Sequence, residues 1–222
     1  MNSKPQVNSH PPKPRLTMRV GVTGHRSNKL DGRALERIGI DLARVFRAIE
    51  QAGNDISKEN VAIYAGEPPQ FRLISGFAEG ADQLGVSVCP SGWLIEAILP
   101  FPKDEYLKDF SDPTARKKFM ELLEKASSIT QLPMLKTQKR IQGYIDAGSY
   151  LLRQIDLLIA IWDGTPPKPG GTGALAKEAH EGGVPVVWIS TGSDHTPRLI
   201  SDFDDSGDPI AADADCTEGP LP

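Results

Sequence analysis

The segment 156–174, which reads DLLIAIWDGTPPKPGGTGA, most constrains what this chain can fold into. Its first seven residues form a short apolar run with a charge at one end and turn residues at the other. Such a run is typical of a strand that is buried on both faces of a parallel sheet. Asp163 and Gly164 end the run, and three prolines between 166 and 169 exclude a helix directly after it. The chain is therefore expected to leave this strand through an irregular turn.

The second half of the segment is a glycine turn that opens a helix. Gly170, Gly171, Thr172 and Gly173 precede residues 174–179 (ALAKEA), which are good helix formers. Unpaired N–H groups at a helix N-terminus attract anions, and glycine lets a phosphate approach the backbone without a Cβ in the way. The pattern predicts a phosphate-binding turn. The alternative is a tight strand-to-helix turn with Thr172 as the N-cap.

Strand-like segments alternate with segments of helical periodicity along most of the chain. Strands are expected at 19–23, 71–75, 93–99, 129–132, 156–162 and 184–189, with a short edge strand at 61–64, and helices at 31–51, 81–88, 112–127, 141–154 and from Thr172. Gly53 is expected to stop the first helix. The alternation predicts an α/β fold: a Rossmann-like, three-layer open parallel sheet with helices on both faces, in a single domain.

The two ends of the chain differ in composition from this middle part. Residues 1–16 are polar and proline-rich, and residues 192–222 are acidic and small. We expect disordered tails without packing at both ends, the second of which could also be a linker to a fused or associated effector. The Rossmann-like domain is expected to occupy residues 17–191.

Composition narrows the classes of function. The formal net charge is −4, so non-specific electrostatic binding of nucleic acid is not expected. No stretch approaches the ~20 apolar residues of a membrane span. Only Cys89 and Cys216 are present, far apart, which fits a reducing cytoplasm. The chain shows no spacing typical of a metal site, no Gly-x-Gly-x-x-Gly and no P-loop, so we expect no metal and no cofactor.

Three strand-to-helix turns contain the residues that we expect to bind a ligand. In a parallel sheet such turns lie along one edge, where α/β proteins bind their ligands. The candidate binding residues are Thr23, Gly24, His25 and Arg26 in the first turn, Ser75, Gly76, Glu79, Gly80 and Asp82 in the second, and Asp163, Gly164, Gly170, Gly171, Thr172 and Gly173 in the third. No catalytic residue is assigned.

Charged residues in these turns have both a ligand-binding and a structural interpretation. Arg26 can pair with a phosphate through two parallel hydrogen bonds, and the carboxylates of Glu79 and Asp82 can accept hydrogen bonds from ribose hydroxyls. The structural alternatives are that Asp82 caps its helix, that Glu79 is solvated, and that Asp163 forms an Asx-type turn with Gly164.

Five motifs, in order, resemble one superfamily. They are GVTGHR at 21–26, ISGFAEGAD at 74–82, LPFPKDEY at 99–106, DLLIAIWDG at 156–164 and PGGTGALAKEA at 169–179. Together they resemble the SMF/DprA–LOG (SLOG) superfamily of Rossmann-like nucleotide-binding domains, over roughly residues 19–189. The resemblance implies that a nucleotide, or a signal derived from one, binds across the turns. It also implies dimers in many members, and sensor roles in prokaryotic signalling and antiviral defence.

That superfamily also includes phosphoribohydrolases of the Lonely Guy type, which release a base from a nucleoside monophosphate. Their motif reads PGGxGTxxE, and here Ala174 replaces the loop threonine. The positions of the family's acids fall on Ala176 and Lys177, and that of its arginine falls on Ala147. The resemblance therefore favours a binding module over a hydrolase.

Two alternatives to a binding module stay open. The first is an N-glycosidic phosphoribohydrolase that uses Glu79, Asp82 or Asp163 in place of the missing acids. The second is a DNA-processing protein like DprA, which the net charge disfavours.

Overall fold

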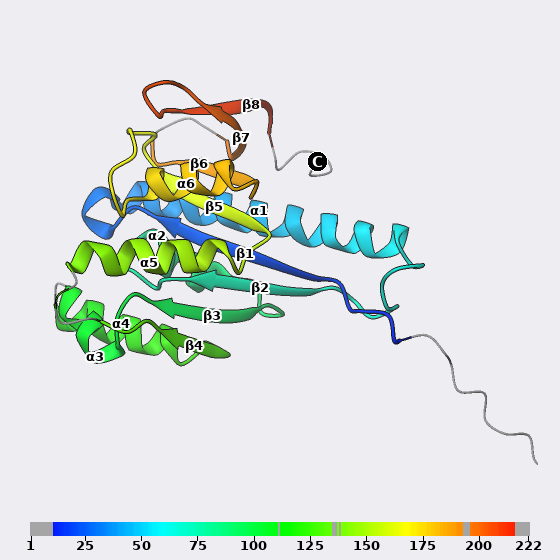
Figure 1. Ribbon diagram of the computed structural model, residues 1–222, viewed down its shortest axis with the longest axis horizontal. Helices are drawn as coiled ribbons and strands as arrows, with labels where there is room; N and C mark the ends of the chain where they lie inside the picture. Colours follow the sequence, from blue (N-terminus) through cyan, green and yellow to red (C-terminus); the bar gives the residue numbers. More distant parts are fainter. Residues whose placement is uncertain (1–10, 111, 135–136, 138, 193–195, 216–222) are drawn as a thin grey trace, which may run out of the picture.

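The centre of the molecule is an eight-stranded sheet with the strand order β4-β3-β2-β1-β5-β6-β7-β8 (Figure 1). The computed structural model describes residues 11–110, 112–134, 137, 139–192 and 196–215. The strands are β1 (Thr17–Gly24), β2 (Gln70–Ser75), β3 (Leu94–Leu99), β4 (Ser128–Gln131), β5 (Leu157–Trp162), β6 (Val186–Ser190), β7 (Arg198–Phe203) and β8 (Pro209–Asp215). Strands β1 to β6 pair in parallel, whereas β7 and β8 are antiparallel.

Strands β1 and β5 lie side by side at the middle of the sheet. They run in register from Val20 opposite Leu157 to Gly24 opposite Ile161. Every residue of β5 is buried, as the apolar run predicted. From β1 the chain continues to β2 on one side, and it later returns to β5 on the other side. This reversal of strand order is the point at which open α/β sheets bind ligands, beyond the carboxyl ends of the strands.

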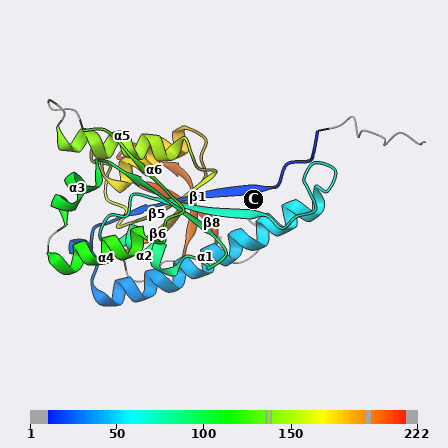
Figure 2. The same ribbon diagram turned by 90° about the horizontal axis from the view of Figure 1, so that it is seen from below.

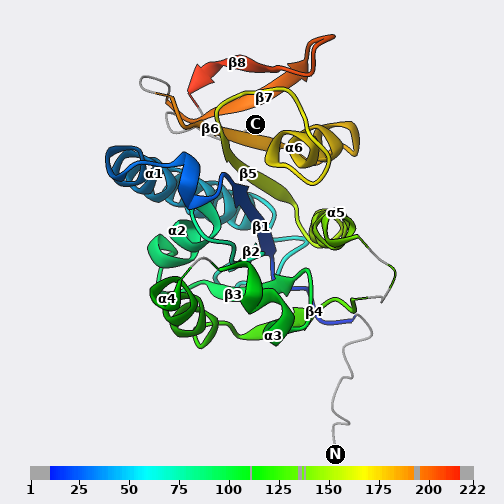
Figure 3. The ribbon, with the colours of Figure 1, turned by 90° about the vertical axis from the view of Figure 1, so that its left-hand side faces the viewer.

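Helices cover both faces of the sheet (Figures 2 and 3). They are α1 (Gly32–Glu59), α2 (Ala81–Val88), α3 (Lys103–Tyr106), α4 (Pro113–Leu123), α5 (Arg140–Leu152) and α6 (Thr172–Glu181). Helices α1, α2 and α4 lie on one face, and α5 and α6 lie on the other. An apolar core fills each interface with the sheet, which confirms the predicted three-layer, single-domain α/β architecture. None of the helices in the described residues is long and apolar enough to cross a membrane.

Helix α1 is longer than the sequence pattern predicted. It continues past Gly53, which does not act as a helix stop but lies against the sheet. A Cβ at Gly53 would come within 2.8 Å of Met18 and Phe71, so the absent side chain lets the helix approach the sheet closely. The expected edge strand at 61–64 is wrong, because these residues form a turn in which the Asn60 carbonyl accepts hydrogen bonds from local N–H groups.

The C-terminal region differs from the expected tail. Strands β7 and β8 extend the sheet as an antiparallel hairpin beyond β6. Ile200 is buried in the core under α6, which gives the hairpin a reason to pack. The acidic composition of this region misled the prediction, since acidic side chains such as Asp202 lie on the exposed part of the hairpin. The rest of the expected tail, 193–195 and 216–222, lies outside the described residues.

The end of the expected N-terminal tail also makes contacts. The Pro14 and Leu16 carbonyls accept hydrogen bonds from the Ala65 and Gln70 N–H groups. Arg15 donates to the Pro68 carbonyl at 2.7 Å. Residues 14–16 therefore run along the segment that precedes β2, while residues 1–10 lie outside the described part of the chain.

Candidate functional site

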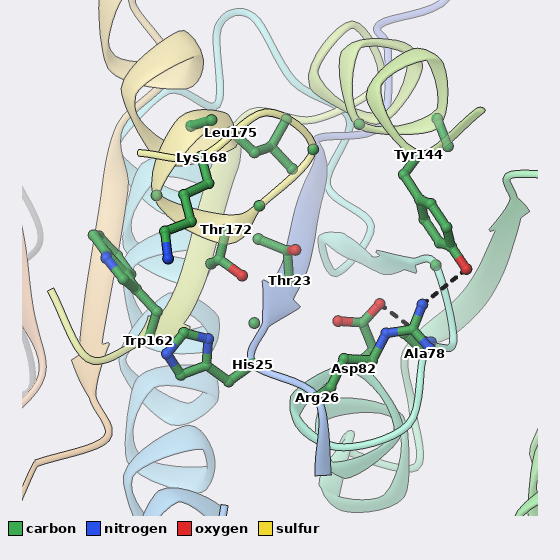
Figure 4. Close-up of a pocket in the computed structure, with 18 of the residues that line it drawn as sticks. Thr23, His25, Arg26, Ala78, Asp82, Tyr144, Trp162, Lys168, Thr172 and Leu175 are labelled. Atoms are coloured by element: carbon green, nitrogen blue, oxygen red, sulfur yellow. Dashed lines mark hydrogen bonds between the residues drawn. The ribbon is translucent and has the colours of Figure 1, made fainter. Parts of the chain in front are cut away.

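A cavity of about 500 Å³ lies at the carboxyl edge of the sheet (Figure 4). Its walls come from the ends of β1 and β5, the N-terminus of α6, the start of α2 and the inner side of α5. Ten of the fifteen predicted binding residues line this cavity: Thr23, Gly24, His25, Arg26, Gly76, Asp82, Gly170, Gly171, Thr172 and Gly173. The tertiary structure thus brings the three glycine turns together. Ser75, Glu79, Gly80, Asp163 and Gly164 are not among its lining residues.

The third turn presents the N-terminus of α6 to the cavity. Residues 168–171 form a tight turn in which the Gly171 N–H donates to the Lys168 carbonyl at 2.8 Å, and Gly170 has a φ of +69°. The Gly171 N–H is therefore already used. Gly171 is the N-cap of α6 and Thr172 is its first residue, not its cap.

The N-cap residue has no side chain, so no side-chain oxygen caps this helix. The first helical residues, Thr172, Gly173 and Ala174, all line the cavity. Their N–H groups come before the first intrahelical hydrogen bond, which Leu175 makes to Gly171. The positive end of the helix dipole therefore lies at the cavity wall, with three backbone donors that have no acceptor in the described part of the chain.

A buried indole lies beside this helix terminus. Trp162 is 1% exposed, lines the cavity, and its Nε1 has no hydrogen-bond partner in the part of the chain that the structure describes. A Cβ at Gly173 would lie 3.4 Å from that nitrogen and 3.2 Å from the Thr165 carbonyl oxygen. Glycine is thus needed at 173 for close packing of α6 on the loop, and a further N–H donor lies at the same end of the cavity.

The second turn is closed on itself, unlike the third. Asp82 is buried at the start of α2, and one carboxylate oxygen accepts from the Ala78 N–H at 3.4 Å. The Ser75 hydroxyl oxygen accepts from the Phe77 N–H at 3.3 Å. These hydrogen bonds use the Phe77 and Ala78 N–H groups within the protein, with the Asp82 carboxylate as one of the acceptors.

Burial raises the pKa of Asp82 to about 6, and hydrogen bonds from Ala78 together with the charge of Arg26 oppose this rise. Gly80 has a φ of +100°, and a Cβ there would lie 2.4 Å from the His25 carbonyl oxygen. Gly80 therefore allows α2 to pack on the first turn instead of contacting a ligand. Glu79 accepts from the Ser27 hydroxyl at 3.1 Å.

Asp163 ties the third turn to the first. Its carboxylate accepts from the Thr165 N–H and hydroxyl, which is the Asx-type turn given above as the structural alternative. The Lys29 ammonium lies 3.6 Å from it. Although burial opposes ionisation, the hydrogen bonds from Thr165 and then from His25 lower the pKa of Asp163 far below its ordinary value.

His25 Nε2 lies 3.0 Å from the Asp163 carboxylate and 3.2 Å from the Asp163 backbone nitrogen. Nε2 can make only one of these hydrogen bonds at a time. Without a proton it accepts from the Asp163 N–H, and with a proton it donates to the Asp163 carboxylate. Burial lowers the pKa of His25 in spite of the carboxylate. In either state the contact holds the loop after β1 against the loop after β5.

Several lining residues were not predicted, and some of them come from α5 and α6. Tyr144, Leu175 and Glu178 line the cavity, and Glu178 accepts from the Ser149 hydroxyl at 2.8 Å. Lys168 also lines the cavity, and because it lies within the predicted glycine loop it could have been found there. Nothing in the pattern of α5 marks Tyr144, since only the tertiary packing of α5 over the sheet places it at the cavity.

The fold and the cavity together define a single-domain, Rossmann-like α/β protein with a ligand-sized cavity at the carboxyl edge of its sheet. No family model and no curated protein matches the chain. The similar solved structures include TM1055, a structural-genomics target, with a TM-score of 0.41, 16% identity, and coverage of 76% of this chain and 72% of that one.

Two further similar structures carry descriptive names. DNA processing protein A from Helicobacter pylori, described for its single-stranded DNA binding mode, has a TM-score of 0.43 and 13% identity, covering 81% of this chain and 68% of that one. The molybdenum cofactor carrier protein from Chlamydomonas reinhardtii has a TM-score of 0.38 and 14% identity, covering 78% and 75%. With TM-scores below 0.5, these likenesses assign neither a ligand nor a reaction to this chain.

Proposed function

We propose that this protein binds a nucleotide, or a signal derived from one, with a phosphate on the N-terminus of α6. The observation that carries the proposal is the uncapped helix terminus: three backbone N–H groups, at Thr172, Gly173 and Ala174, face the cavity. The Thr172 side chain and the Lys168 ammonium point to the same region (Figure 4). Backbone donors, a hydroxyl and a cation are the groups that recognise a phosphate.

The remainder of the cavity suits the nucleoside part of such a ligand. Its volume of about 500 Å³ lies within the roughly 300–1,000 Å³ of small-molecule sites. The wall between the sheet and α5 is apolar and is formed by Val22, Ile98, Pro100, Ile145, Leu151 and Leu175. An apolar wall facing polar turns would hold a flat base on one side and a phosphate on the other.

Binding without hydrolysis is the function that the lining residues favour. Ala147, at the position of the phosphoribohydrolase arginine, does line the cavity, but it offers only a methyl group there. The hydrolase remains a second candidate, because the carboxyl groups of Asp82 and Glu178 line the cavity. Glu79 and Asp163, the other acids proposed for it, are not among the lining residues.

A screen against nucleoside monophosphates separates the two candidates. A binding module should show an increase in Tm with at least one of AMP, GMP, CMP or UMP, and no release of free base during prolonged incubation. Base release that scales with protein concentration and is lost in Asp82→Asn or Glu178→Gln would instead identify a hydrolase. If no monophosphate raises Tm, the proposed function fails.

The substitution Gly171→Asp tests the phosphate position directly. An aspartate at the N-cap accepts hydrogen bonds from the second or third N–H of the helix, so its carboxylate should occupy the place of the phosphate. We expect nucleotide affinity to fall roughly tenfold or more, because two or three charge-assisted hydrogen bonds are lost. Tm should stay near that of the wild type, since the cap offsets the tight approach of the new Cβ to the Lys168 carbonyl, at 3.1 Å.

Gly171→Asn is the matched control. It has the same shape and also caps the helix, but it carries no charge. We expect its affinity for the nucleotide to lie between those of the wild type and of Gly171→Asp. Titration calorimetry on all three proteins, with Tm measured alongside, distinguishes lost binding from lost folding. A folded Gly171→Asp protein with wild-type affinity would show that the phosphate does not bind at α6.

A further inference from the structure

Arg26 is a cation at the end of the cavity opposite α6. It lies two residues after the end of β1, and its side chain is largely withdrawn from solvent. Among the described residues, Arg26 donates a hydrogen bond to the neutral hydroxyl of Tyr144, at 2.9 Å, and no carboxylate lies within ion-pair distance of it. A guanidinium carries five N–H donors and is costly to bury without a counter-ion. Arg26 therefore has donors available for an anion inside the cavity.

A chain of polar contacts fixes the partner of Arg26. The Tyr144 hydroxyl donates to Asp109, which leaves its oxygen lone pairs to accept from Arg26. Asp109 in turn accepts from Arg140 at 2.7 Å, and Arg140 donates to Glu105 at 2.9 Å. Four residues outside the first turn thus hold one guanidinium in place.

The ring of Tyr144 supports the same guanidinium, whose carbon lies 5.3 Å from the ring centroid. Burial, and then the hydrogen bond to Asp109, raise the pKa of Tyr144 to about 12, so the phenol keeps its proton at neutral pH. A cation supported by a neutral phenol keeps its full charge for a ligand. Tyr144 is therefore a positioning residue for Arg26.

Asp82 is an acid whose charge acts on Arg26, but it does not form an ion pair with it. It acts on the guanidinium through its charge alone, while its oxygens accept from the Ala78 and Gly24 N–H groups and the Ser75 hydroxyl. In Figure 4, Thr23 lies between Thr172 on one side and Arg26 with Tyr144 on the other, so the two cationic regions form opposite ends of the cavity.

We propose that Arg26, positioned by Tyr144, is a second anion subsite, and that the ligand is a nucleotide carrying a second phosphate distant from the first. This inference rests on the proposed function, which places the first phosphate on α6. It specifies the class of ligand: a nucleoside bisphosphate, or a larger nucleotide with phosphates at two ends, instead of a simple monophosphate. The guanidinium would bind the second phosphate through two parallel hydrogen bonds.

The test compares each nucleoside monophosphate that binds in the screen with its 3′,5′- and 2′,5′-bisphosphates by titration calorimetry. We expect one bisphosphate to bind the wild type at least tenfold more tightly than the monophosphate, at constant ionic strength. In Arg26→Gln this ratio should fall to near one. In Tyr144→Phe it should fall severalfold, because the ring remains while the hydroxyl that orients Arg26 is lost.

Lys168→Gln is the control for a general effect of positive charge. Lys168 lies at the α6 end, so its loss should weaken mono- and bisphosphate binding alike and leave their ratio unchanged. If Arg26→Gln does not fold, as judged by circular dichroism, Arg26→Lys replaces it, and the ratio should then fall severalfold because a lysine cannot form two parallel hydrogen bonds.

Two results would overturn the inference in distinguishable ways. A wild-type protein that binds a monophosphate but neither bisphosphate more tightly would refute the second subsite and leave the proposed function standing. A bisphosphate advantage that survives in folded Arg26→Gln would place the second phosphate elsewhere. Absence of binding to every nucleotide would refute the proposed function itself, and the inference with it.

Discussion

Asp82 contributes differently to stability in its protonated and ionised forms. The residue is 6% exposed, and burial raises the pKa of its carboxyl group from an ordinary value of 3.8 to about 6. The folded protein therefore holds this proton more tightly than the unfolded chain does. The resulting stabilisation is fully present below about pH 4 and is lost as pH rises through 6. At neutral pH a buried carboxylate remains beside the cavity, at a cost on the order of 3 kcal/mol.

Asp82→Asn should remove this pH dependence. Between pH 4 and pH 7 the wild type should lose stability as Asp82 ionises, whereas the variant should not. The free energy of unfolding of the variant should therefore increase relative to that of the wild type by roughly 2–3 kcal/mol over this range. Urea denaturation of both proteins at pH 4, 5, 6 and 7 measures the difference. The hydrogen bonds that the variant loses change its free energy of unfolding by the same amount at every pH, so they do not affect the pH dependence of the difference. A difference that does not change with pH would mean that the Asp82 carboxyl titrates normally.

At the scale of elements, the β7–β8 hairpin is the clearest departure from the sequence-based expectation. It lies against the loop that carries the glycine turn, since a Cβ at Gly207 would come within 2.6 Å of Pro167. The hairpin also contacts the C-terminal turn of α6, where the His180 and Phe203 rings lie 5.7 Å apart. The hairpin therefore contacts both the loop before α6 and the last turn of the helix.

Two isoleucines of the hairpin test whether it packs as described. Ile200 is 7% exposed, whereas Ile210 on the neighbouring strand is 46% exposed. Ile200→Ala should cost about 2–3 kcal/mol and lower Tm by roughly 5–10 °C, because it removes a buried side chain. Ile210→Ala, the matched control, should leave Tm nearly unchanged. Calorimetry checks both, and equal, negligible shifts would mean that the region beyond 191 behaves as the unpacked tail first expected.

At the scale of the whole molecule, the protection of backbone amides against hydrogen exchange should decrease from the middle of the sheet to its edges. Every residue of β5 is buried, whereas β4 is an edge strand with exposed residues at Ser128, Ile129 and Gln131. Amide hydrogen exchange should therefore be slowest in β1 and β5 and much faster in β4, because edge amides open without breaking the core. Mass spectrometry of exchanged peptides measures this order. Protection in β4 equal to that in β5 would contradict it.

Amide hydrogen exchange also tests the homodimer, which stays a prediction. If two copies pair through β4 or β8, exchange at that edge should slow as protein concentration rises, because the edge N–H groups would become paired. Exchange at both edges that is independent of concentration, together with a monomeric mass in solution, would exclude a dimer formed in this way.

The sequence alone determined the architecture around the site. The apolar run at 157–162 is typical of a strand buried on both faces, and the prolines and glycines after it exclude a helix before Thr172. Six parallel strands and the helices between them followed from such local signals, because period, length and turn residues act within a few positions of the chain. Residues 198–215 could not be identified in this way, because exposed acidic residues such as Asp202 surround the one core residue, Ile200, that packs under α6.

The tertiary structure alone decided which of the candidate residues share a cavity. Both the second and the third glycine turn contain candidate binding residues in sequence, yet in the second the Asp82 carboxylate accepts from the Ala78 N–H, while in the third no side chain caps the N-terminus of α6. Tyr144 reaches the cavity only because α5 packs across the sheet edge, more than a hundred positions from Arg26 in the chain. The physical reason is that hydrogen-bond partners and burial depend on contacts between distant segments, which no local pattern encodes.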